Sequence, residues 1–340
     1  MATNLINTHR TFSVGWLDAL QHRLQGDRLT TLTATVTKTL LAPVFAIAVF
    51  LLVWGIGAAH VETSLGQLPG PTQVWHSGQQ LIAEYQQERQ REAAFNERQH
   101  KRNEARLAKD PDAEVMLRPY TGMPTFFDQI GTSLVTVATG FLLASLIAIP
   151  IGIVCGMSTI LYQALNPIIQ VFKPVSPLAW LPLVTIVVSA VYVSDDPMLS
   201  KSFVTSAITV ALCCIWPTII NTTVGVSAVD KDLVNVSRVL RLGWFTKTMK
   251  IVLPSAIPMM FAGLRLSLSI GWMVLIAAEM LAQNPGLGKF VWDEFQNGSS
   301  DSLARIMVAV FVIGFIGFLL DRFMLLLQRW ASWDKSAVLR

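Results

Sequence analysis

Two charged residues interrupt a long apolar run of the sequence, and they are the side chains best placed to do chemistry there. Arg265 and Glu279 lie within an otherwise uncharged stretch from Ile257 to Leu281. A charge within such a stretch is costly and persists where it has a function or a partner. Arg265 is predicted to offer positive potential to a passing anion. Glu279, nearly four helical turns further and roughly on the same face, is predicted to be paired near an external gate. The alternative is that both side chains bond to neighbouring helices and hold them together.

The remaining reactive residues form no recognisable catalytic or metal-binding pattern. The sequence has no HExxH or GxSxG motif and no His and Cys cluster at metal-ligand spacing. Gly288-Lys289 comes nearest to a phosphate-binding loop, but Gln283 and Phe290 stand where that loop needs a glycine and a hydroxyl residue. We therefore expect no metal site, no cofactor and no enzymatic activity in this chain. Three cysteines in apolar runs are predicted to be small buried hydrophobes: Cys155, Cys213 and Cys214.

The composition indicates a membrane protein. Of the 340 residues, 52% are hydrophobic and 14% are charged, whereas roughly a quarter of the residues of an ordinary soluble protein are charged. This balance argues against a soluble enzyme, and the excess of apolar residues excludes a disordered chain. The net charge of +4 does not indicate nucleic-acid binding, because Lys and Arg collect on the cytoplasmic side of membrane proteins. Membrane lipid is the expected solvent for much of the chain.

Six apolar stretches are long enough to cross a bilayer core of about 30 Å as helices. The predicted spans are 40–59, 130–157, 174–194, 202–222, 257–281 and 303–327. The sixth span carries Asp321 and Arg322 near one end, where long side chains can reach the interface. A short interfacial stretch broken by Pro167 is expected between the second and third spans. The fold class predicted from these spans is an all-α polytopic membrane protein with about six transmembrane helices.

The Lys and Arg residues of the short loops predict the orientation of the spans. The segment between the fourth and fifth spans is basic, whereas the loops after the third and fifth spans carry more Asp and Glu than Lys. The basic segment and both termini are therefore placed in the cytoplasm. The resulting divisions are an N-terminal segment 1–39, a first span 40–59, a periplasmic loop 60–128, a core 129–328 with a cytoplasmic loop 226–256, and a tail 329–340.

The external loop contains a charge-laced stretch, Leu81–Lys109, that is made of strong helix formers. Glu97 and Lys101 stand four residues apart, a spacing that pairs them on one face of a helix. The stretch is predicted to be a solvated helix. A docking surface for a partner is the alternative.

The cytoplasmic segment from Asp230 to Pro254 has the pattern of a short amphipathic helix. Its apolar stripe is formed by Leu233, Val236 and Leu240. Gly243 is predicted to end this helix, since glycine adopts the positive φ that a helix end often requires. A second short helix over 245–252 is expected to lead to Pro254. Such a knob is suited to transmit movement from a soluble partner; a helix lying on anionic lipid is the alternative.

Two pieces of this segment carry a resemblance to a known family. They are Asn235-Val236-Ser237-Arg238-Val239-Leu240-Arg241 and, with its first proline thirteen residues after Arg241, Ile251-Val252-Leu253-Pro254-Ser255-Ala256-Ile257-Pro258. They resemble the EAA loop of binding-protein-dependent ABC importer permeases, which has roughly Glu-Ala-Ala, three residues, Gly and a hydrophobic-x-Leu-Pro ending. The chain departs from that pattern at Asn235, Ser237 and Arg241, which stand for the Glu, the second Ala and the Gly. With Gly243 two positions later, these departures predict a displaced bend.

Further pieces in the family's order extend the resemblance over nearly the whole chain from Leu40, except the charged insert. They are Leu68-Pro69-Gly70-Pro71, Pro177-Leu178-Ala179-Trp180-Leu181-Pro182-Leu183, Asn221-Thr222, Gly263-Leu264-Arg265 and Ala277-Ala278-Glu279-Met280. Together they resemble the nitrate, taurine, alkanesulfonate and bicarbonate branch of the family. The stretches 173–180 and 235–240 are most similar to nitrate, nitrite and cyanate permeases.

The resemblance implies a type I importer permease fold in the inner membrane and a homodimer around one pathway. It also implies a periplasmic or lipid-anchored substrate-binding protein and two ABC ATPase subunits that bind ATP and Mg²⁺. The ATPase-coupling residues that it implies are Asn235, Val236, Ser237, Arg238, Leu240, Arg241, Gly243 and Pro254. The implied function is ATP-driven import of a small anion by alternating access, nitrate first and nitrite or cyanate next. A taurine, alkanesulfonate or bicarbonate permease and a gradient-driven secondary carrier are the alternatives.

Overall fold

The computed structural model describes residues 41–63, 66–110, 115, 117–193, 199–299 and 301–331. The predicted segment 1–39 and most of the predicted tail 329–340 lie outside these residues. The chain divides into two compact units at Pro71. The first unit contains helix α3 (Ala42–His60) and an antiparallel hairpin of β1 (Glu62–Thr63) and β2 (Gly66–Gln67).

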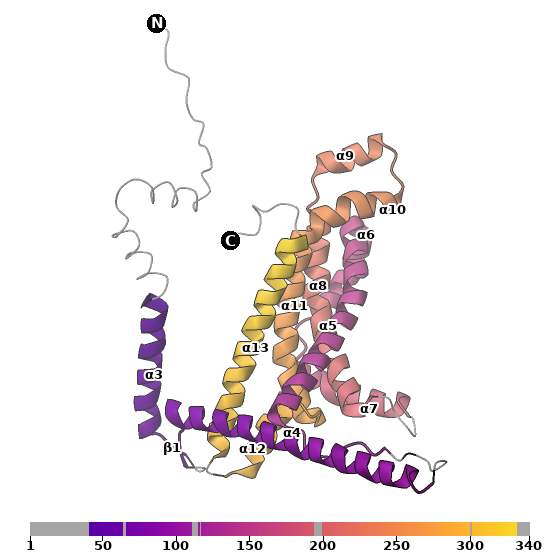
Figure 1. Cartoon of the computed structure of the whole chain (residues 1–340). Coiled ribbons are helices and arrows are strands. Elements are labelled where there is room, and N and C mark those ends of the chain that lie inside the picture. The colour runs from indigo at the N-terminus through magenta and orange to yellow at the C-terminus, as the bar shows by residue number, and fades with distance from the viewer. Residues whose placement is uncertain are drawn as a thin grey trace, which may run out of the picture. The chain divides into compact units, whose positions relative to one another are not determined.

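The second unit is helical, and Figure 1 shows its elements from α4 to α13. In chain order they are α4 (Pro71–Leu107), α5 (Phe126–Met157), α6 (Thr159–Phe172), α7 (Pro177–Val191), α8 (Lys201–Ser227), α9 (Lys231–Val239), α10 (Trp244–Lys247), the π-helical turn η2 (Thr248–Val252), α11 (Leu253–Ala282), α12 (Leu287–Asn297) and α13 (Ser302–Ala331). The predicted all-α class is confirmed, with β1 and β2 as a minor exception.

Five helices in the described part of the chain are long and apolar enough to cross a membrane. They are α3, α5, α8, the continuous helix Trp244–Ala282 and α13. They correspond to the first, second, fourth, fifth and sixth predicted spans. The helices α8, Trp244–Ala282 and α13 extend beyond both predicted bounds, and α3 and α5 extend beyond one, because the helices continue into polar sequence at the ends of the apolar runs.

The predicted third span, 174–194, takes a different form. Its helix α7 has 15 residues, and it is long enough to span a bilayer only together with α6, from which it is bent by 99°. The stretch expected to be interfacial is instead the 14-residue helix α6, with Pro167 inside it. The bend follows from Pro174 and Pro177, because proline lacks a backbone N–H and disfavours a helical conformation in the preceding residue. A broken helix pair therefore replaces the single straight span.

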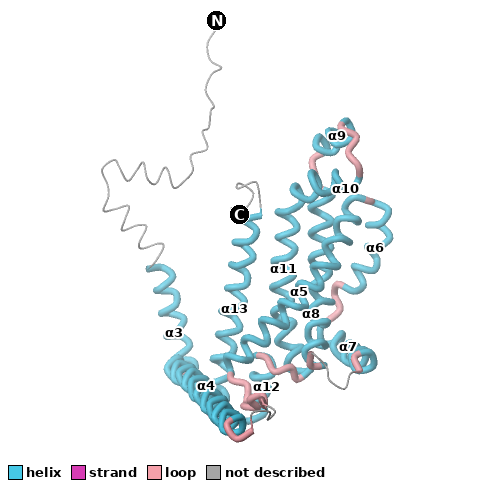
Figure 2. Tube along the Cα trace, turned by 45° about the vertical axis from the view of Figure 1, so that its right-hand side comes forward, coloured by secondary structure: helices cyan, strands magenta, loops and turns pink. Residues whose placement is uncertain are grey.

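Helix α8 lies at the centre of the core and packs on both α5 and α11, which Figure 2 shows running alongside it. Close approach depends on glycines: a Cβ added to Gly152 of α5 would lie 2.6 Å from the Cβ of Thr222. Small residues allow membrane helices to pack this closely. Ser267 of α11 donates its hydroxyl to the carbonyl of Cys214 at 2.5 Å, and the Cys214 thiol donates to the carbonyl of Ser267 at 3.2 Å.

The three cysteines are free thiols, as their positions in apolar sequence predict. Cys155 and Cys214 are buried, and Cys213 is half-buried. The prediction of small buried hydrophobes is therefore confirmed for two of them.

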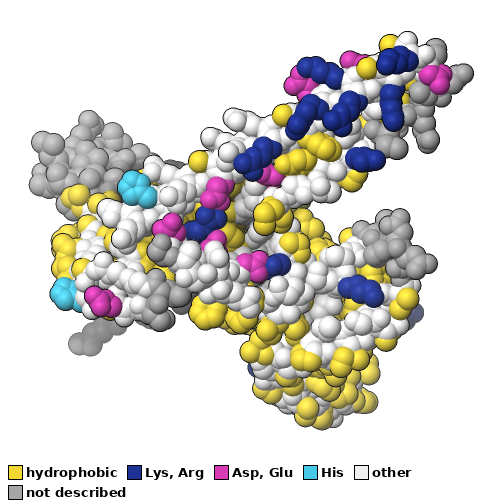
Figure 3. All heavy atoms as spheres, turned by 90° about the horizontal axis from the view of Figure 1, so that it is seen from below, with side chains coloured by type: hydrophobic (Ala, Val, Ile, Leu, Met, Phe, Trp, Pro, Cys, Tyr) yellow, Lys and Arg dark blue, Asp and Glu magenta, His cyan; other side chains and the backbone are white. Residues whose placement is uncertain are grey.

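The charged stretch of the predicted external loop lies in α4, a single helix of 37 residues. The predicted pair of Glu97 and Lys101 is confirmed, with 2.6 Å between Oε1 and Nζ. Figure 3 shows Lys and Arg side chains along the projecting part of this helix. Arg98, Arg102 and Arg106 are all exposed. The predicted helix is present with most of its charged side chains exposed, and its solvation and the docking-surface alternative both stay predictions.

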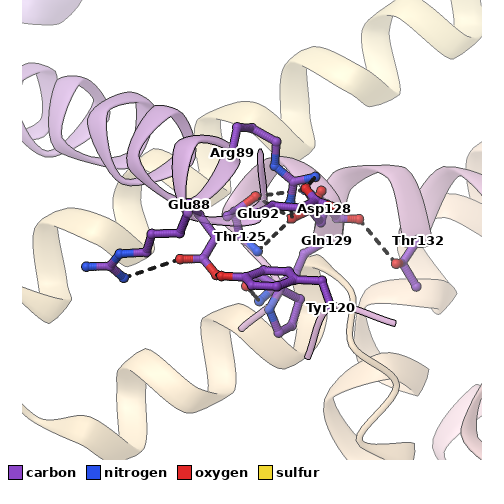
Figure 4. A network of polar contacts seen from close by, with 10 residues as sticks. Glu88, Arg89, Glu92, Tyr120, Thr125, Asp128, Gln129 and Thr132 are labelled. Carbon is purple, nitrogen blue, oxygen red and sulfur yellow. Dashed lines mark hydrogen bonds and ion pairs between the residues drawn. The ribbon is translucent and has the colours of Figure 1, made fainter. Parts of the chain in front are cut away.

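A polar network attaches α4 to the start of α5 (Figure 4). Arg89 of α4 pairs with the carboxylate of Asp128, with Nη2 and Oδ2 2.9 Å apart. The same carboxylate accepts the backbone N–H of Thr125 at 2.9 Å, and Thr125 and Asp128 together cap the start of α5. The hydroxyl of Tyr120 donates to Glu88 at 2.7 Å, and this hydrogen bond raises the pKa of Tyr120. The network fixes the direction of α4 at the point where α5 enters the core.

Candidate functional site

The predicted coupling segment forms a helical knob at the end of the core opposite α4 and α12 (Figure 1). Asp230 caps the start of helix α9, and its carboxylate accepts the N–H of Asp232 at 2.9 Å. Among the described side chains of α9, that of Ser237 is buried and the others are exposed or half-buried. The helix therefore makes little contact with the rest of its own chain.

The apolar side chains of this knob face outward. Val239 is 82% exposed and Leu240 is 63% exposed. We name the exposed set the knob surface; it consists of Leu233, Val236, Val239, Leu240, Trp244 and Phe245. Beside it, Asp232 and Asn235 line a groove together with Val236, Val239 and Leu240. An exposed apolar patch marks an interaction site, so the predicted apolar stripe is present and needs a cover from outside this chain.

The helix end at Arg241 corrects the prediction that Gly243 stops α9. Arg241 has a positive φ of 49°, whereas Gly243 has φ −62° and precedes α10. The N–H of Arg241 donates to the carbonyl of Arg238, and the N–H of Leu242 donates to the carbonyl of Ser237, each at 3.0 Å. These two bonds form a Schellman motif. The bend therefore stays at the position where the resembling family has its glycine and is not displaced.

The predicted separate helix over 245–252 is also corrected. Helix α10, the turn η2 and α11 form one continuous helix from Trp244 to Ala282. The turn η2 widens this helix so that the N–H of Leu253 reaches the carbonyl of Thr248, five residues back. Pro254 follows at the start of α11, where a missing N–H costs little because the wider turn precedes it. The knob is thus joined to α11 without a flexible link.

Side-chain contacts connect the base of the knob to the other core helices. The hydroxyl of Thr248 lies 3.4 Å from the Sδ of Met157 at the end of α5. Val252 and Ala256 belong to a buried cluster with Val226 of α8. Because these contacts reach both α5 and α8, a displacement of the knob would move three helices of the core together.

Arg265 is paired with an acidic residue of the last helix. Its guanidinium makes a two-bond contact with the carboxylate of Asp321 on α13, with Nη2 and Oδ2 2.9 Å apart. The pair is partly exposed, with 40% of the Arg265 side chain and 24% of the Asp321 side chain accessible, and it neutralises both groups within apolar helices. This partner agrees with the helix-holding alternative, and the pathway role of Arg265 stays a prediction.

Glu279 is fully buried among hydrogen-bond donors from two other elements. The hydroxyl of Ser133 on α5 lies 2.8 Å from each carboxylate oxygen, and the N–H of Gly288 on α12 donates at 3.0 Å. Gly286 must be a glycine, because a Cβ there would lie 2.1 Å from Oε1 of Glu279. Glu279 is thus paired at the α4 end of the core, on different partners from Arg265.

The sequence pattern assigned no role to a cavity of about 400 Å³ between the α6–α7 break, α8 and α11. Lys173, Trp180, Trp216 and Asn221 are among its lining residues. A lysine directly before Pro174 in otherwise uncharged sequence was the available signal, but a single residue has no spacing from which a partner could be inferred. The fold brings these four side chains together from three helical segments.

The residues that the resemblance implies for coupling lie on neighbouring elements of the knob and its base, and their coupling role stays a prediction. Asn235, Val236, Ser237 and Arg238 lie on α9, Leu240 and Arg241 follow its last residue, Gly243 precedes α10 as its N-cap, and Pro254 is the second residue of α11. Within the described residues, no group of three or more His, Cys, Asp or Glu side chains could hold a metal ion.

Comparison with known proteins agrees with this arrangement. Residues 148–333 match the family model described as "Binding-protein-dependent transport system inner membrane component". The nitrate import permease protein NrtB of Synechococcus elongatus is 40% identical over 214 residues, which are 60% of this chain and 72% of that protein. The bicarbonate transport system permease protein CmpB of Synechocystis sp. is 32% identical over 301 residues, 85% of this chain and 88% of that protein.

The fold also has a solved counterpart. A chain of the MetNI methionine ABC transporter, in an inward-facing conformation, superposes with a TM-score of 0.52 and 13% identity, covering 61% of this chain and 96% of that one. This likeness shows the fold alone. The family match covers more than half of the sequence and includes the knob, the cavity and both intramembrane charges. This chain therefore belongs to the family of inner-membrane components of binding-protein-dependent transport systems, as a multi-pass permease subunit of an ABC importer.

Proposed function

We propose that this chain is the permease subunit of an importer for a small inorganic anion, with nitrate as the first substrate. In this proposal a homodimer encloses the pathway, two separate ATPase subunits bind the knob surfaces, and a periplasmic or lipid-anchored binding protein delivers the anion. The knob end of the core then faces the cytoplasm, and the α4 end faces the periplasm.

The observation that carries this proposal is the exposed apolar knob surface on a helix that continues into the core. Val239 and Leu240 are mostly exposed, and α10 continues through η2 into α11. Burying such a surface gives a partner roughly 25 cal/mol for each Å² of apolar area. A partner that closes on ATP could therefore hold and move the knob.

The mechanism follows from the rigid connection. ATP binding closes the two ATPase subunits and brings the two knobs together. Because Thr248, Val252 and Ala256 couple the knob base to α5 and α8, the core helices turn and open the pathway on the α4 side. Release of the hydrolysis products lets the knobs separate and opens the other side. The anion is thereby moved without any chemistry on this chain.

Nitrate permeases among the relatives support nitrate as the first substrate of this proposal. Two proteins described as NrtB are each 40% identical to this chain, over 214 and 200 residues. Bicarbonate is the second candidate, because one CmpB protein aligns over 301 residues at 32% identity and another over 205 residues at 38%. Nitrite and cyanate are monovalent anions of similar size and belong to the same test.

The experiment is uptake into liposomes that contain the complete transporter, built from this chain, its ATPase and its binding protein. We expect ATP-dependent accumulation of nitrate that requires the binding protein. Bicarbonate, nitrite, cyanate and taurine are measured in parallel under the same conditions. Accumulation of bicarbonate without nitrate would replace the proposed substrate and leave the ATPase coupling intact.

The purified chain alone in liposomes provides the control for the energy source. We expect it to move none of these solutes when an ion gradient is imposed. Uptake driven by the gradient alone would make the chain a secondary carrier and would overturn the proposed coupling.

A further inference from the structure

The projecting end of α4 carries a groove lined by positive charge. We name residues 95–107 of this helix the arm, and the groove of about 680 Å³ along it the arm groove. No Asp or Glu among the described residues lines the arm groove. Its charged lining residues are all cations and all exposed: Arg98, Arg102, Arg106, Lys109 and Arg118. The first three recur at every fourth position, which places them on one face of the helix.

The fold brings the last of these cations, Arg118, against the arm. The side-chain amide of Gln99 donates to the carbonyl of Arg118 and accepts its backbone N–H, each at 2.9 Å. The rings of Phe95 and Tyr120 lie 5.4 Å apart, and the hydroxyl of Tyr120 donates to Glu88 (Figure 4). These contacts hold the returning chain beside the arm, so the arm groove is a formed feature with two walls.

The cations of the arm groove have no acidic partner within the described residues. The ion pairs formed by the charged residues of α4 involve other cations, such as Lys101, which pairs with Glu97. Like charges four residues apart destabilise a helix, and Arg118 adds a further cation from outside it. A groove lined by one sign of charge attracts a partner of the opposite sign. The missing counter-charge is therefore expected on another molecule.

The size and the exposure of the arm groove favour an acidic protein surface as that partner. Water and salt screen exposed charges, so a single small anion gains little from each of them. A protein face with several carboxylates can pair with several guanidinium groups, each by two hydrogen bonds. Figure 3 views the molecule from the α4 side, and Lys and Arg side chains lie along the arm on this face. A soluble protein approaching from this side reaches them, whereas the spanning helices lie behind the arm.

The base of α4 is tied to the helices at the same end of the core. Arg305 of α13 donates two hydrogen bonds to Glu84, at 2.7 and 2.9 Å, and it also pairs with Glu294 of α12 at 2.6 Å. Arg89 pairs with Asp128 at the start of α5. A protein held by the arm is thus held beside the ends of α5, α12 and α13, where the proposed pathway opens toward the periplasm.

We propose that the arm groove is a docking site for an acidic face of the substrate-binding protein, whose carboxylates pair with the five cations. This assignment rests on the proposed function for the identity of the partner and on the lining of the groove for its chemistry. The arm lies outside residues 148–333, which match the family model. Membership of the family therefore does not by itself assign a role to the arm.

The affinity of the binding protein for the complete transporter tests this docking site. The transporter with its ATPase subunits is held in nanodiscs of phosphatidylcholine, a lipid without net charge, and the purified binding protein is titrated. We expect Arg98→Glu and Arg106→Glu each to raise the Kd at least about fivefold, because a repulsive contact replaces an attractive one. The Kd of the wild type is expected to rise with salt. A Kd that neither substitution changes overturns the site.

Lys101→Glu is the matched control for these two substitutions. It reverses an exposed charge on the same helix, but Lys101 does not line the arm groove. We expect its Kd to stay within about twofold of that of the wild type. An equal loss of affinity in Lys101→Glu and Arg106→Glu would show that net charge acts without a specific groove, and it would overturn the site. Thermal unfolding of all three variants checks that the fold is unchanged.

Two other occupants of the arm groove are distinguished by the same variants. An effect of Arg98→Glu and Arg106→Glu that appears only in nanodiscs with anionic phosphatidylglycerol would assign the groove to lipid head groups. An unchanged Kd together with lost binding of free nitrate to the transporter would assign it to a small anion. Either result overturns docking of the binding protein.

The outcomes also separate the docking site from the proposed function. Nitrate uptake at limiting binding protein that is equal in the wild type and in Arg106→Glu would overturn the docking site and leave the proposed function standing. Uptake of bicarbonate in place of nitrate, with a raised Kd for Arg106→Glu, would overturn nitrate as the substrate and support the docking site.

Discussion

Ser133 of α5 joins Glu279 of α11 to the first turn of α12. Its hydroxyl lies 2.8 Å from both carboxylate oxygens, and its own oxygen accepts the N–H of Leu287 at 2.9 Å. The carboxylate also accepts the N–H of Gly288. A buried acidic side chain thus closes the α11–α12 turn onto α5, at the end of the core that carries α4.

Replacing Glu279 should therefore destabilise the fold. Glu279→Ala leaves the hydroxyl of Ser133 and the N–H of Gly288 buried without an acceptor, and we expect the free energy of unfolding to fall by about 2–4 kcal/mol. Thermal unfolding of the purified chain in detergent measures the change. Glu279→Gln keeps one acceptor oxygen and should lose less; an unchanged unfolding temperature for Glu279→Ala would contradict the bracing role.

The ion pair of Arg265 and Asp321 predicts a non-additive effect on assembly. Arg265→Leu leaves Asp321 as an unpaired, partly exposed charge on an apolar helix, so we expect a loss of folded protein in the membrane. The double variant Arg265→Leu with Asp321→Leu should recover that yield, measured by size-exclusion chromatography. If the double variant does not recover the yield of folded protein, the loss in Arg265→Leu is not caused by the unpaired carboxylate of Asp321. Nitrate uptake of the recovered double variant then tests the pathway role of Arg265, which predicts uptake well below that of the wild type.

Charge on the knob surface should prevent ATPase binding without affecting the fold. Val239→Asp changes a side chain that is 82% exposed, and it places a charge in an apolar contact. We expect co-purification of the ATPase to fall by at least about tenfold, and likewise for Leu240→Asp and Arg238→Glu. Arg102→Glu on α4 is the control, because it also reverses an exposed charge and lies at the opposite end. An ATPase that still co-purifies with Val239→Asp would contradict coupling through this surface.

The turn after α9 predicts different effects at two positions that stand two residues apart. Arg241→Gly relieves a left-handed conformation that a side chain disfavours, and it should stabilise the knob by about 1 kcal/mol. Gly243→Ala should have little effect on the turn, because φ −62° suits any residue. Hydrogen exchange of the α9 amides measures both. A strongly destabilising Gly243→Ala would restore the interpretation in which Gly243 ends the helix.

Two glycines of α5 differ in their surroundings and should differ in their response to alanine. A Cβ at Gly152 would lie 2.6 Å from Thr222, whereas a Cβ at Gly131 would meet nothing within 4 Å. We expect Gly152→Ala to lower the free energy of unfolding by about 1–3 kcal/mol, because α5 and α8 must separate. Gly131→Ala should raise it by about 0.5–1 kcal/mol, because alanine favours the helix. Equal effects of the two substitutions on thermal unfolding would exclude close packing as the cause.

Much of the architecture was accessible from local sequence. A helix in lipid must satisfy its own backbone hydrogen bonds, so an uncharged run of sufficient length predicts a span, and five of six spans are found where they were expected. The apolar stripe with Leu233 and Val236 predicted an amphipathic α9 for the same kind of local reason, since helical periodicity alone places these residues on one face. The four-residue spacing of Glu97 and Lys101 likewise predicted their ion pair.

Tertiary structure decided the features that depend on a partner distant in the sequence. Asp321 is 56 positions from Arg265 and Ser133 is 146 positions from Glu279, and nothing in the local pattern names either partner. The left-handed turn fell on Arg241 because the hydrogen bonds that end α9 fix it there, although a glycine was available two residues later. The cavity at Lys173 exists because three helical segments meet at one break. Local sequence sets which elements form and which faces are apolar; the packing of those elements determines which side chains meet, because that depends on the arrangement of the whole core.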